Sequence, residues 1–166
     1  AIFGTLEALG APPFIVNAFK AMYGSLRRRF RYGRRDGSEW SASNGLAQGC
    51  PASPDLLNML YEPFHRWAAQ QREMGIDIIY KDFIHHLASA GYADDIVLFA
   101  RSWAAATLLI NQFLKWCSLL GLQVNVKKTQ IWTNAPGVRE VPLNGQTVSV
   151  RLTFKVVGIE VGEAER

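Results

Sequence analysis

Apolar residues recur every three or four positions in three stretches of this chain, which predicts three helices. The clearest stretch begins at Ser53-Pro54, where serine suits the N-cap and proline suits the first helical position. Pro63 predicts a kink within this helix. The apolar positions that follow the helical spacing are Leu56, Leu57, Leu60, Phe64 and Trp67.

The other two stretches carry equally clear helix boundaries. After a helix end at residues 4–9, Pro12-Pro13 opens a helix that reaches about Tyr23. Ser102 predicts the cap of a helix at 103–120, which Gly121 ends. The apolar stripes of these two helices are Phe14, Ala18, Phe19 and Met22 in the first, and Leu109, Phe113, Trp116 and Leu120 in the second.

Runs of β-branched and aromatic residues between turn signals predict the strands. We expect single strands at 26–32, 39–43, 124–133 and 153–161, a short strand with a loop at 76–84, and a hairpin at 86–100. The segment from Gly33 to Gly37 predicts a turn, and Asn144-Gly145 predicts a tight hairpin turn. Helices that alternate with mainly antiparallel strands indicate an α+β fold.

Two adjacent carboxylates occupy the centre of the hairpin predicted at 86–100. Asp94 and Asp95 follow Tyr92 and Ala93 and precede an apolar run that predicts a buried strand. Because buried like charges disfavour each other's ionisation, we expect a cation to neutralise them. Oxygen ligands favour Mg²⁺ or Mn²⁺, and two such ions suit phosphoryl transfer. One Asp pair rarely holds two ions, so we expect a third carboxylate elsewhere. The alternative interpretation of an Asp-Asp pair is a solvated turn.

The composition favours one globular domain in a reducing compartment. Of the 166 residues, 49% are hydrophobic, which is enough for a core. The two cysteines, Cys50 and Cys117, offer neither a disulfide framework nor zinc-ligand spacing. No stretch reaches the length of a transmembrane helix and no signal peptide opens the chain, so we expect an intracellular protein that does not enter a membrane.

The net charge of +4 is concentrated near the start of the chain. The first forty residues hold seven basic and three acidic side chains, whereas the remainder is balanced at eleven of each. The excess comes from Arg27, Arg28, Arg29, Arg31, Arg34 and Arg35. Such a local basic stripe is typical of nucleic-acid binding, and the alternatives are a solvated basic edge strand or a polybasic targeting patch.

Four sequence blocks resemble those of reverse transcriptases and occur in the same order. The segment 92–95, Tyr-Ala-Asp-Asp, with the apolar run after it resembles the catalytic hairpin. The segment 48–54 is similar to the Gln-Gly-x-Pro-x-Ser-Pro block, with Cys50 as in non-LTR (LINE-type) retrotransposon polymerases. The segment 121–129 resembles Gly-Leu-x-Asn-x-x-Lys-Thr, and 154–159 stands where the family has its primer grip.

This resemblance implies the palm and part of the fingers of a right-hand polymerase. Residues 1–50 would hold fingers and palm helices with the basic hairpin, 51–135 the palm with the catalytic hairpin, and 136–166 a hairpin with primer-grip-like strands. The implied activity is RNA-directed DNA polymerisation, in which dNTPs are added to the 3′-hydroxyl of a DNA primer on an RNA template. A retrotransposon product would work in the nucleus and the cytoplasm.

The resemblance also implies roles for individual residues. Asp94 and Asp95 would bind the catalytic Mg²⁺ or Mn²⁺ ions, and Lys128 would stabilise the leaving pyrophosphate. Contacts to the incoming nucleotide would come from Gln48, Gly49, Tyr92 and Ala93. Contacts to nucleic acid would come from Arg27, Arg28, Arg29, Arg31, Arg34, Arg35, Phe154 and Lys155.

The family's first catalytic aspartate has no counterpart here, because Glu7 is the only acidic residue before Asp36. We therefore expect a fragment that starts after that block and polymerises little by itself. One alternative is an RNA-templated RNA polymerase, in which Gly-Asp-Asp is more usual. Two others are a degenerate domain that only binds nucleic acid or protein, and an unrelated α+β domain with chance motifs.

Overall fold

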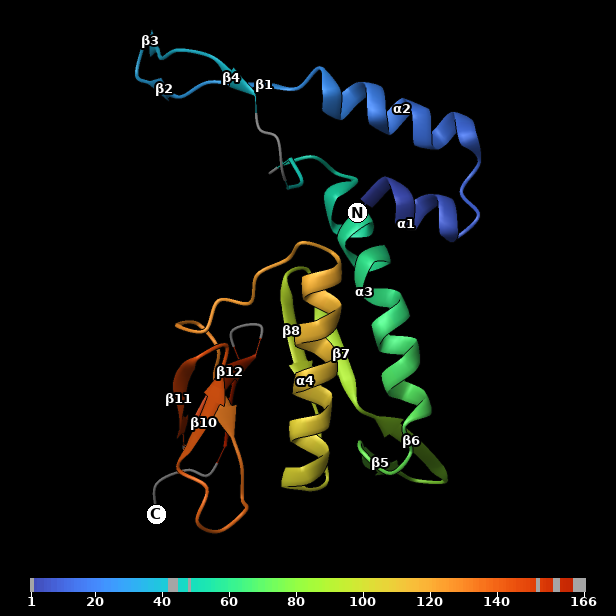
Figure 1. The fold of residues 1–166 in the computed structure, drawn as a ribbon, viewed down its shortest axis with the longest axis vertical. Helices are drawn as coiled ribbons and strands as arrows, with labels where there is room; N and C mark the ends of the chain where they lie inside the picture. Colours follow the sequence, from blue (N-terminus) through green and yellow to red (C-terminus); the bar gives the residue numbers. More distant parts are fainter. Residues whose placement is uncertain (1, 42–44, 48, 152, 157–158, 163–166) are drawn as a thin grey trace. The chain divides into compact units, whose positions relative to one another are not determined.

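The computed structural model describes residues 2–41, 45–47, 49–151, 153–156 and 159–162, with the backbone alone at 154, 156, 159 and 161. The chain forms two compact units, Ala1–Leu60 and Tyr61–Arg166 (Figure 1). Helix α3, Ser53–Gln70, contributes residues to both units. No helix in the described part of the chain combines the length and the apolar character that crossing a membrane requires.

Three helices build the core of the first unit. Helices α1 (Ile2–Ala8) and α2 (Pro13–Gly24) pack together, joined by a turn in which Gly10 has a φ of 83°. The predicted start of α2 is confirmed, since Pro12 stands at the N-cap position and proline opens the first turn. The buried side chains of this core are Leu6, Val16 and Leu56. Each stabilises the fold by about 1.5–3 kcal/mol relative to an exposed side chain.

The basic segment of the first unit forms a broken hairpin. Strand β1 (Arg27–Arg28) pairs with β4 (Trp40–Ser41), and β2 (Arg31–Tyr32) pairs with β3 (Arg35–Asp36), both antiparallel. The single strand predicted at 26–32 is wrong, because the ladder is interrupted between β1 and β2, where the Gly37 amide donates to the Phe30 carbonyl at 2.8 Å. Part of the return strand predicted at 39–43 lies outside the described residues.

Helix α3 begins as predicted but without the predicted cap. Ser53 is its first helical residue, and the Ser53 hydroxyl donates to the Ala47 carbonyl at 2.8 Å. That hydroxyl therefore holds the preceding loop against the helix instead of capping free amides. The helix continues through Pro63 to Gln70.

The core of the second unit lies between two helices and a hairpin. Helix α4 (Trp103–Leu119) packs on β8 (Asp95–Leu98), which pairs with β7 (Ser89–Tyr92). Ser102 caps α4 as predicted, because its side chain accepts a hydrogen bond from the Ala105 amide at 3.2 Å. The buried centre consists of Phe64, Ala68, Ala88 and Leu109. Figure 1 shows α4 lying over the β7–β8 hairpin, with the second half of α3 beside it.

The remaining strands of the second unit form small sheets. The segment predicted as a short strand and a loop is a full hairpin of β5 (Ile76–Tyr80) and β6 (Phe83–Leu87). Strand β10 (Glu140–Leu143) pairs with β11 (Gln146–Arg151) through the predicted Asn144-Gly145 turn, in which both residues have positive φ. Strand β11 also pairs in parallel with β9 (Ile131–Trp132).

Two strand predictions in this unit are wrong. Only Ile131–Trp132 is a strand within the predicted 124–133, because Asn125 organises a turn before it. The Asn125 carbonyl accepts from the amides of Lys128 and Thr129, both at 3.0 Å. The last predicted strand is two antiparallel strands, β12 (Thr153–Val156) and β13 (Ile159–Gly162). Helices with small, mainly antiparallel sheets confirm the α+β class.

Candidate active site

The Asp pair lies at the tip of the β7–β8 hairpin. Tyr92 pairs with Asp95 across the hairpin, so Ala93 and Asp94 form its two-residue turn. Ala93 has a φ of 52°, in the left-handed region that alanine adopts at a cost of about 1–2 kcal/mol. Such a conformation persists only where the surrounding structure imposes it, and it is frequent at functional sites.

Both carboxylates are exposed, which corrects the prediction of a buried charge pair. Within the described residues, neither the Asp94 nor the Asp95 carboxylate has an ion pair or a hydrogen bond. Their four oxygens are therefore free to bind a cation.

Helix α3 fixes the hairpin from one side through two residues that sequence reasoning missed. His65 Nδ1 and the Ser89 hydroxyl are 2.8 Å apart, which joins α3 to the start of β7. Tyr61 is buried, and burial together with the charges of Cys117 and Asp94 raises the pKa of its phenol. Tyr61 and His65 follow the same helical spacing as the apolar stripe of α3. That spacing was the sequence signal that these two residues lie on the packed face of the helix.

The pKa of His65 gives a prediction for stability. Burial lowers the pKa of this imidazole, and the nearby Glu62 carboxylate only partly opposes the shift. Since the unfolded chain has the ordinary His pKa near 6.5, it takes up the proton before the folded chain does. His65 therefore stabilises the fold above about pH 6.5, and that contribution is lost as the pH falls toward the lower folded pKa.

We expect the free energy of unfolding to fall between pH 7.5 and pH 5.5, and to fall less in His65→Gln. Urea denaturation followed by tryptophan fluorescence measures both slopes. The pKa of Asp77 is lowered, mainly by its hydrogen bond from His86, so the titration of Asp77 changes stability only at more acidic pH and does not contribute between pH 7.5 and pH 5.5. Equal pH slopes in the two proteins would show that His65 carries no such linkage.

The carboxylate oxygens at the hairpin tip match the ligand preference of a hard divalent cation, but they do not complete its coordination. Carboxylate oxygens are the ligands that Mg²⁺ and Mn²⁺ prefer. The described residues contain no group of three or more His, Cys, Asp and Glu side chains that could complete such a site. A cation bound by Asp94 and Asp95 would therefore require further oxygen ligands.

The other predicted site residues lie on separate elements. Lys128 belongs to the second unit and lies on the turn organised by Asn125, not within the strand predicted at 124–133. Lys155 lies in β12 opposite Glu160, and only the backbone of Phe154 is described. In the first unit, Gly49 has a φ of 83° and open space beside its Cα. Gln48 lies outside the described residues.

The six arginines lie on or beside the strands of the broken hairpin in the first unit. The structure therefore places Tyr92, Ala93, Asp94 and Asp95 at one hairpin tip, and the roles of all the predicted site residues stay predictions.

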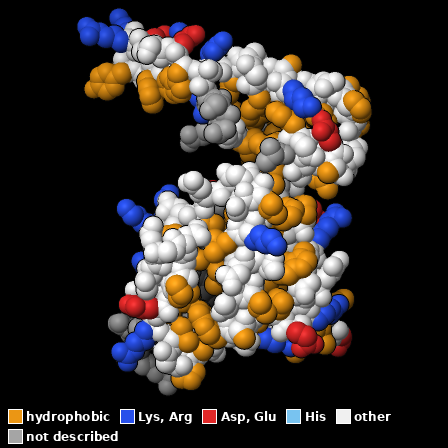
Figure 2. All heavy atoms as spheres, viewed as in Figure 1, with side chains coloured by type: hydrophobic (Ala, Val, Ile, Leu, Met, Phe, Trp, Pro, Cys, Tyr) orange, Lys and Arg blue, Asp and Glu red, His pale blue; other side chains and the backbone are white. Residues whose placement is uncertain are grey.

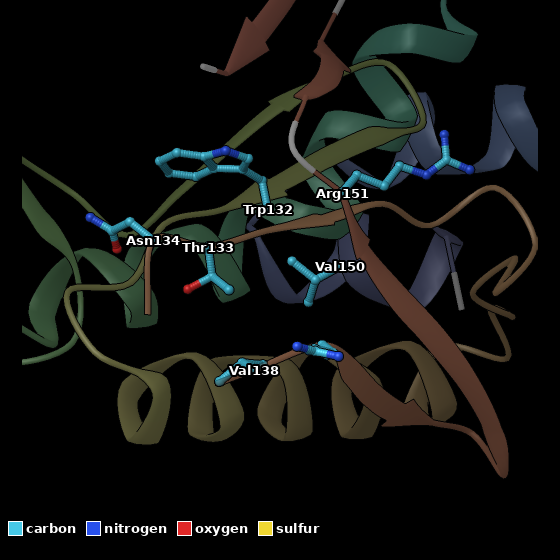
Figure 3. A pocket seen from close by; sticks show the side chains of 7 residues that line it. Trp132, Thr133, Asn134, Val138, Val150 and Arg151 are labelled. Atoms are coloured by element: carbon cyan, nitrogen blue, oxygen red, sulfur yellow. The ribbon is translucent and has the colours of Figure 1, made fainter. Parts of the chain in front are cut away.

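A hollow of about 500 Å³ lies beside β9 and β11, and none of the predicted site residues lines it. Figure 3 shows Thr133 and Val150 directed toward Val138, while Trp132 and Arg151 extend to the other side of the strands. This arrangement follows from the register, because Trp132 pairs with Arg151. The lining residues are Trp132, Thr133, Asn134, Val138, Arg139, Val150 and Arg151.

Divalent metal ions bound by carboxylates serve phosphoryl transfer in polymerases, nucleases and phosphatases. A family model for reverse transcriptase (RNA-dependent DNA polymerase) matches residues 1–161. The chain therefore belongs to the reverse transcriptase family.

Two relatives with transposon names are similar to this chain. It is 27% identical over 99% of its residues to the retrovirus-related Pol polyprotein from type-2 retrotransposable element R2DM of Drosophila melanogaster. It is 28% identical over 60% of its residues to the transposon TX1 uncharacterized 149 kDa protein of Xenopus laevis. The predicted resemblance to non-LTR retrotransposon reverse transcriptases is confirmed. The chain spans 15% of the first relative and matches 7% of the second.

Proposed function

We propose that this chain is the part of a retrotransposon polymerase that carries its catalytic carboxylate pair. The polymerase adds dNTPs to the 3′-hydroxyl of a DNA primer on an RNA template. The observation that supports this proposal is the hairpin tip, where Asp94 and Asp95 are exposed and form no hydrogen bond or ion pair with the described residues. Helices α3 and α4 pack against the base of that hairpin, and this packing positions the strands that carry the two carboxylates.

In this proposal the second unit contains the palm. Asp94 and Asp95 hold Mg²⁺ or Mn²⁺ together with oxygen ligands from elsewhere in the polymerase. When bound, the metal supplies charge stabilisation for the attacking and leaving oxygens of the phosphoryl transfer. The left-handed backbone of Ala93 turns the chain sharply enough to place the two carboxylates at the end of a narrow hairpin.

The remaining predicted residues bind the substrates. Lys128 stabilises negative charge on the pyrophosphate, and its place on a hydrogen-bonded turn limits the freedom of its backbone. Gln48, Gly49, Tyr92 and Ala93 contact the incoming nucleotide. Phe154 and Lys155 contact the primer, and the arginines at 27–35 contact template or primer phosphates. The protein works in the nucleus and the cytoplasm.

Primer extension tests the proposal with the full-length polymerase that carries this chain. We expect dNTPs to be added to a DNA primer on an RNA template in Mg²⁺, with no addition after chelation by EDTA. Ribonucleotides replace the dNTPs in a parallel reaction. Equal incorporation of ribonucleotides would indicate an RNA polymerase, and binding without any extension would indicate a degenerate domain; either result contradicts the proposal.

A further inference from the structure

The broken hairpin of β1 to β4, residues 27–41, exposes an unusual amount of aromatic surface. Phe30 is 77% exposed, Tyr32 is 91% exposed and Trp40 is 39% exposed. The rings of Phe30 and Trp40 lie against each other with centroids 4.8 Å apart, tilted by 31°. Trp40 also stands opposite Arg28 in the β1–β4 register. Three aromatic side chains are thus exposed to solvent, which favours a ligand with planar groups that can stack on them.

The arginines of the same hairpin fall into two groups. Arg29 and Arg31 form ion pairs with Asp36, at 3.2 and 2.8 Å. Arg28 donates a hydrogen bond to the Leu46 carbonyl at 3.4 Å. The three without an ion pair or a hydrogen bond to any described residue are Arg27, Arg34 and Arg35. These three guanidinium groups are available to an external anion.

Charge points to a polyanion as the partner of this surface. The hairpin carries six arginines against Asp36 and Glu39, so it is strongly positive for its length. Figure 2 shows basic side chains at the tip of the β1–β4 lobe and hydrophobic side chains along one of its edges. Cations beside exposed rings match the alternation of phosphates and bases in a nucleic-acid strand.

We propose that the hairpin 27–41 binds single-stranded nucleic acid, with unpaired bases stacked on Phe30, Tyr32 and Trp40. Arg27, Arg34 and Arg35 bind the phosphates between those bases. In a duplex the faces of the bases are covered by stacking on each other. A duplex therefore binds the arginines through its phosphates but does not stack on the aromatic rings. The inference deepens the proposed phosphate contact of the arginines and rests on it, because it specifies an unpaired strand as the ligand.

Fluorescence anisotropy with three labelled probes tests this inference on the 166-residue chain. The probes are a 12-nucleotide oligo(U), an abasic ribose-phosphate strand of the same length, and a 12-base-pair RNA duplex. We expect oligo(U) to bind at least about fivefold tighter than the abasic strand, as one stacked base implies. The double variant Phe30→Leu/Tyr32→Leu keeps apolar side chains but removes two of the three rings, and we expect it to lose most of the preference for oligo(U), with Trp40 retaining the rest.

Three further variants separate stacking from charge and from general effects of substitution. Phe83→Leu changes a ring of similar exposure, 76%, in the β5–β6 hairpin, and we expect it to leave all three affinities unchanged. Arg27→Gln/Arg34→Gln/Arg35→Gln weakens binding of every probe and lowers the salt slope by about 2, at roughly 0.7 per phosphate. Arg29→Gln/Arg31→Gln has a smaller effect, because Asp36 already neutralises part of their charge. Circular dichroism checks that each variant is folded.

Three results would overturn the inference. They are equal binding of oligo(U) and the abasic strand by the unaltered chain, a preference for the duplex, and an unchanged preference in the double variant. Preferential binding to anionic lipid vesicles over all three probes would also overturn it, by assigning the surface to a membrane. Primer extension tests the proposed function independently of this inference. If the chain prefers oligo(U) but the full-length polymerase extends no primer, the inference is supported and the proposed function is contradicted.

Discussion

Asp94→Asn should reduce nucleotide addition by the full-length polymerase about a thousandfold or more. The substitution keeps the shape of the side chain but removes a negative oxygen from the proposed metal site. Metal stabilisation of phosphoryl transfer contributes several kcal/mol, and each 1.36 kcal/mol changes the rate tenfold. Primer extension under single-turnover conditions on an RNA template measures the loss.

The stability of the fold should hardly change in this variant. Asp94 is exposed and makes no hydrogen bond or ion pair with the described residues, so we expect the free energy of unfolding to change by less than about 0.5 kcal/mol. A loss of activity without a loss of stability is the pattern of a metal ligand. Extension at the normal rate by Asp94→Asn would remove the carboxylate from the mechanism.

The chain provides a matched control in the β5–β6 hairpin. Its turn is Lys81-Asp82, closed by the pair Tyr80 and Phe83, and Lys81 has a φ of 53°. The catalytic turn has the same construction, since it is closed by Tyr92 and Asp95 and Ala93 has a φ of 52°. Asp82→Asn therefore makes the same chemical change in the same backbone setting. We expect extension within about twofold of normal, and an equally large loss there would show that the assay reports something other than the metal site.

The similarity of these two hairpins also shows why a motif of this kind is difficult to interpret from local sequence alone. Both turns place an exposed aspartate after a residue with positive φ, yet only one carries a second carboxylate at the closing pair. The family resemblance distinguished them, because it joined Asp94 and Asp95 to three other blocks along the chain. Local propensity predicts a turn in each case and has no information on what the turn binds.

Signals that act within one turn of the backbone predicted the fold well. The proline pair fixed the start of α2, the Ser102 side chain capped α4, and Asn144-Gly145 closed the β10–β11 hairpin. Each signal depends on one residue's own dihedral preference or on a hydrogen bond three residues away. Such effects are present in the sequence itself and need no tertiary contact.

The wrong predictions come from interactions that compete with these local preferences. The apolar residues after Gly121 favoured a long strand, but the carbonyl of Asn125 accepts the next amides and forms a turn instead. The Asp pair was expected to be buried because its flanking residues are apolar, but burial depends on how many strands and helices cover the tip. Tyr61 and His65 support the hairpin only because α3 packs on it, and this contact spans residues 24 positions apart.

Gly75→Ala should destabilise the second unit by about 2–3 kcal/mol, the largest stability effect we expect from a single methyl group. A Cβ on Gly75 would lie 2.6 Å from the Leu87 carbonyl oxygen and 2.7 Å from His86 Nε2. The first of these atoms is backbone in the β5–β6 hairpin, so it cannot move aside without disturbing the strand pairing. Forcing extra volume into a packed site typically costs 1–3 kcal/mol.

The surroundings of Gly75 leave little room for relief. The Gly75 carbonyl accepts a hydrogen bond from Arg101 Nε at 2.8 Å, and the Arg101 amide donates to the Met74 carbonyl at 3.0 Å. On the other side, the His86 side chain is only 5% exposed and its Nδ1 lies 2.9 Å from the Asp77 carboxylate. A shift of Gly75 would stretch the hydrogen bonds that Arg101 donates to the carbonyls of Gly75 and Met74. A shift of His86 would stretch its hydrogen bond to Asp77. Either movement therefore weakens a hydrogen bond.

Urea denaturation followed by tryptophan fluorescence suits this prediction. Four of the five tryptophans lie at positions 67, 103, 116 and 132, within the second unit, so the signal reports mainly that unit. Gly91→Ala is the matched control in the same unit, because its added Cβ meets only side-chain ends, His65 Nε2 at 3.0 Å and Ile96 Cδ1 at 3.1 Å. Those groups can rotate away, so we expect a cost below about 1 kcal/mol. Equal denaturation midpoints for the two variants would mean that the backbone around Gly75 adapts freely, and that the junction of Arg101, Gly75 and His86 does not hold the β5–β6 hairpin in place.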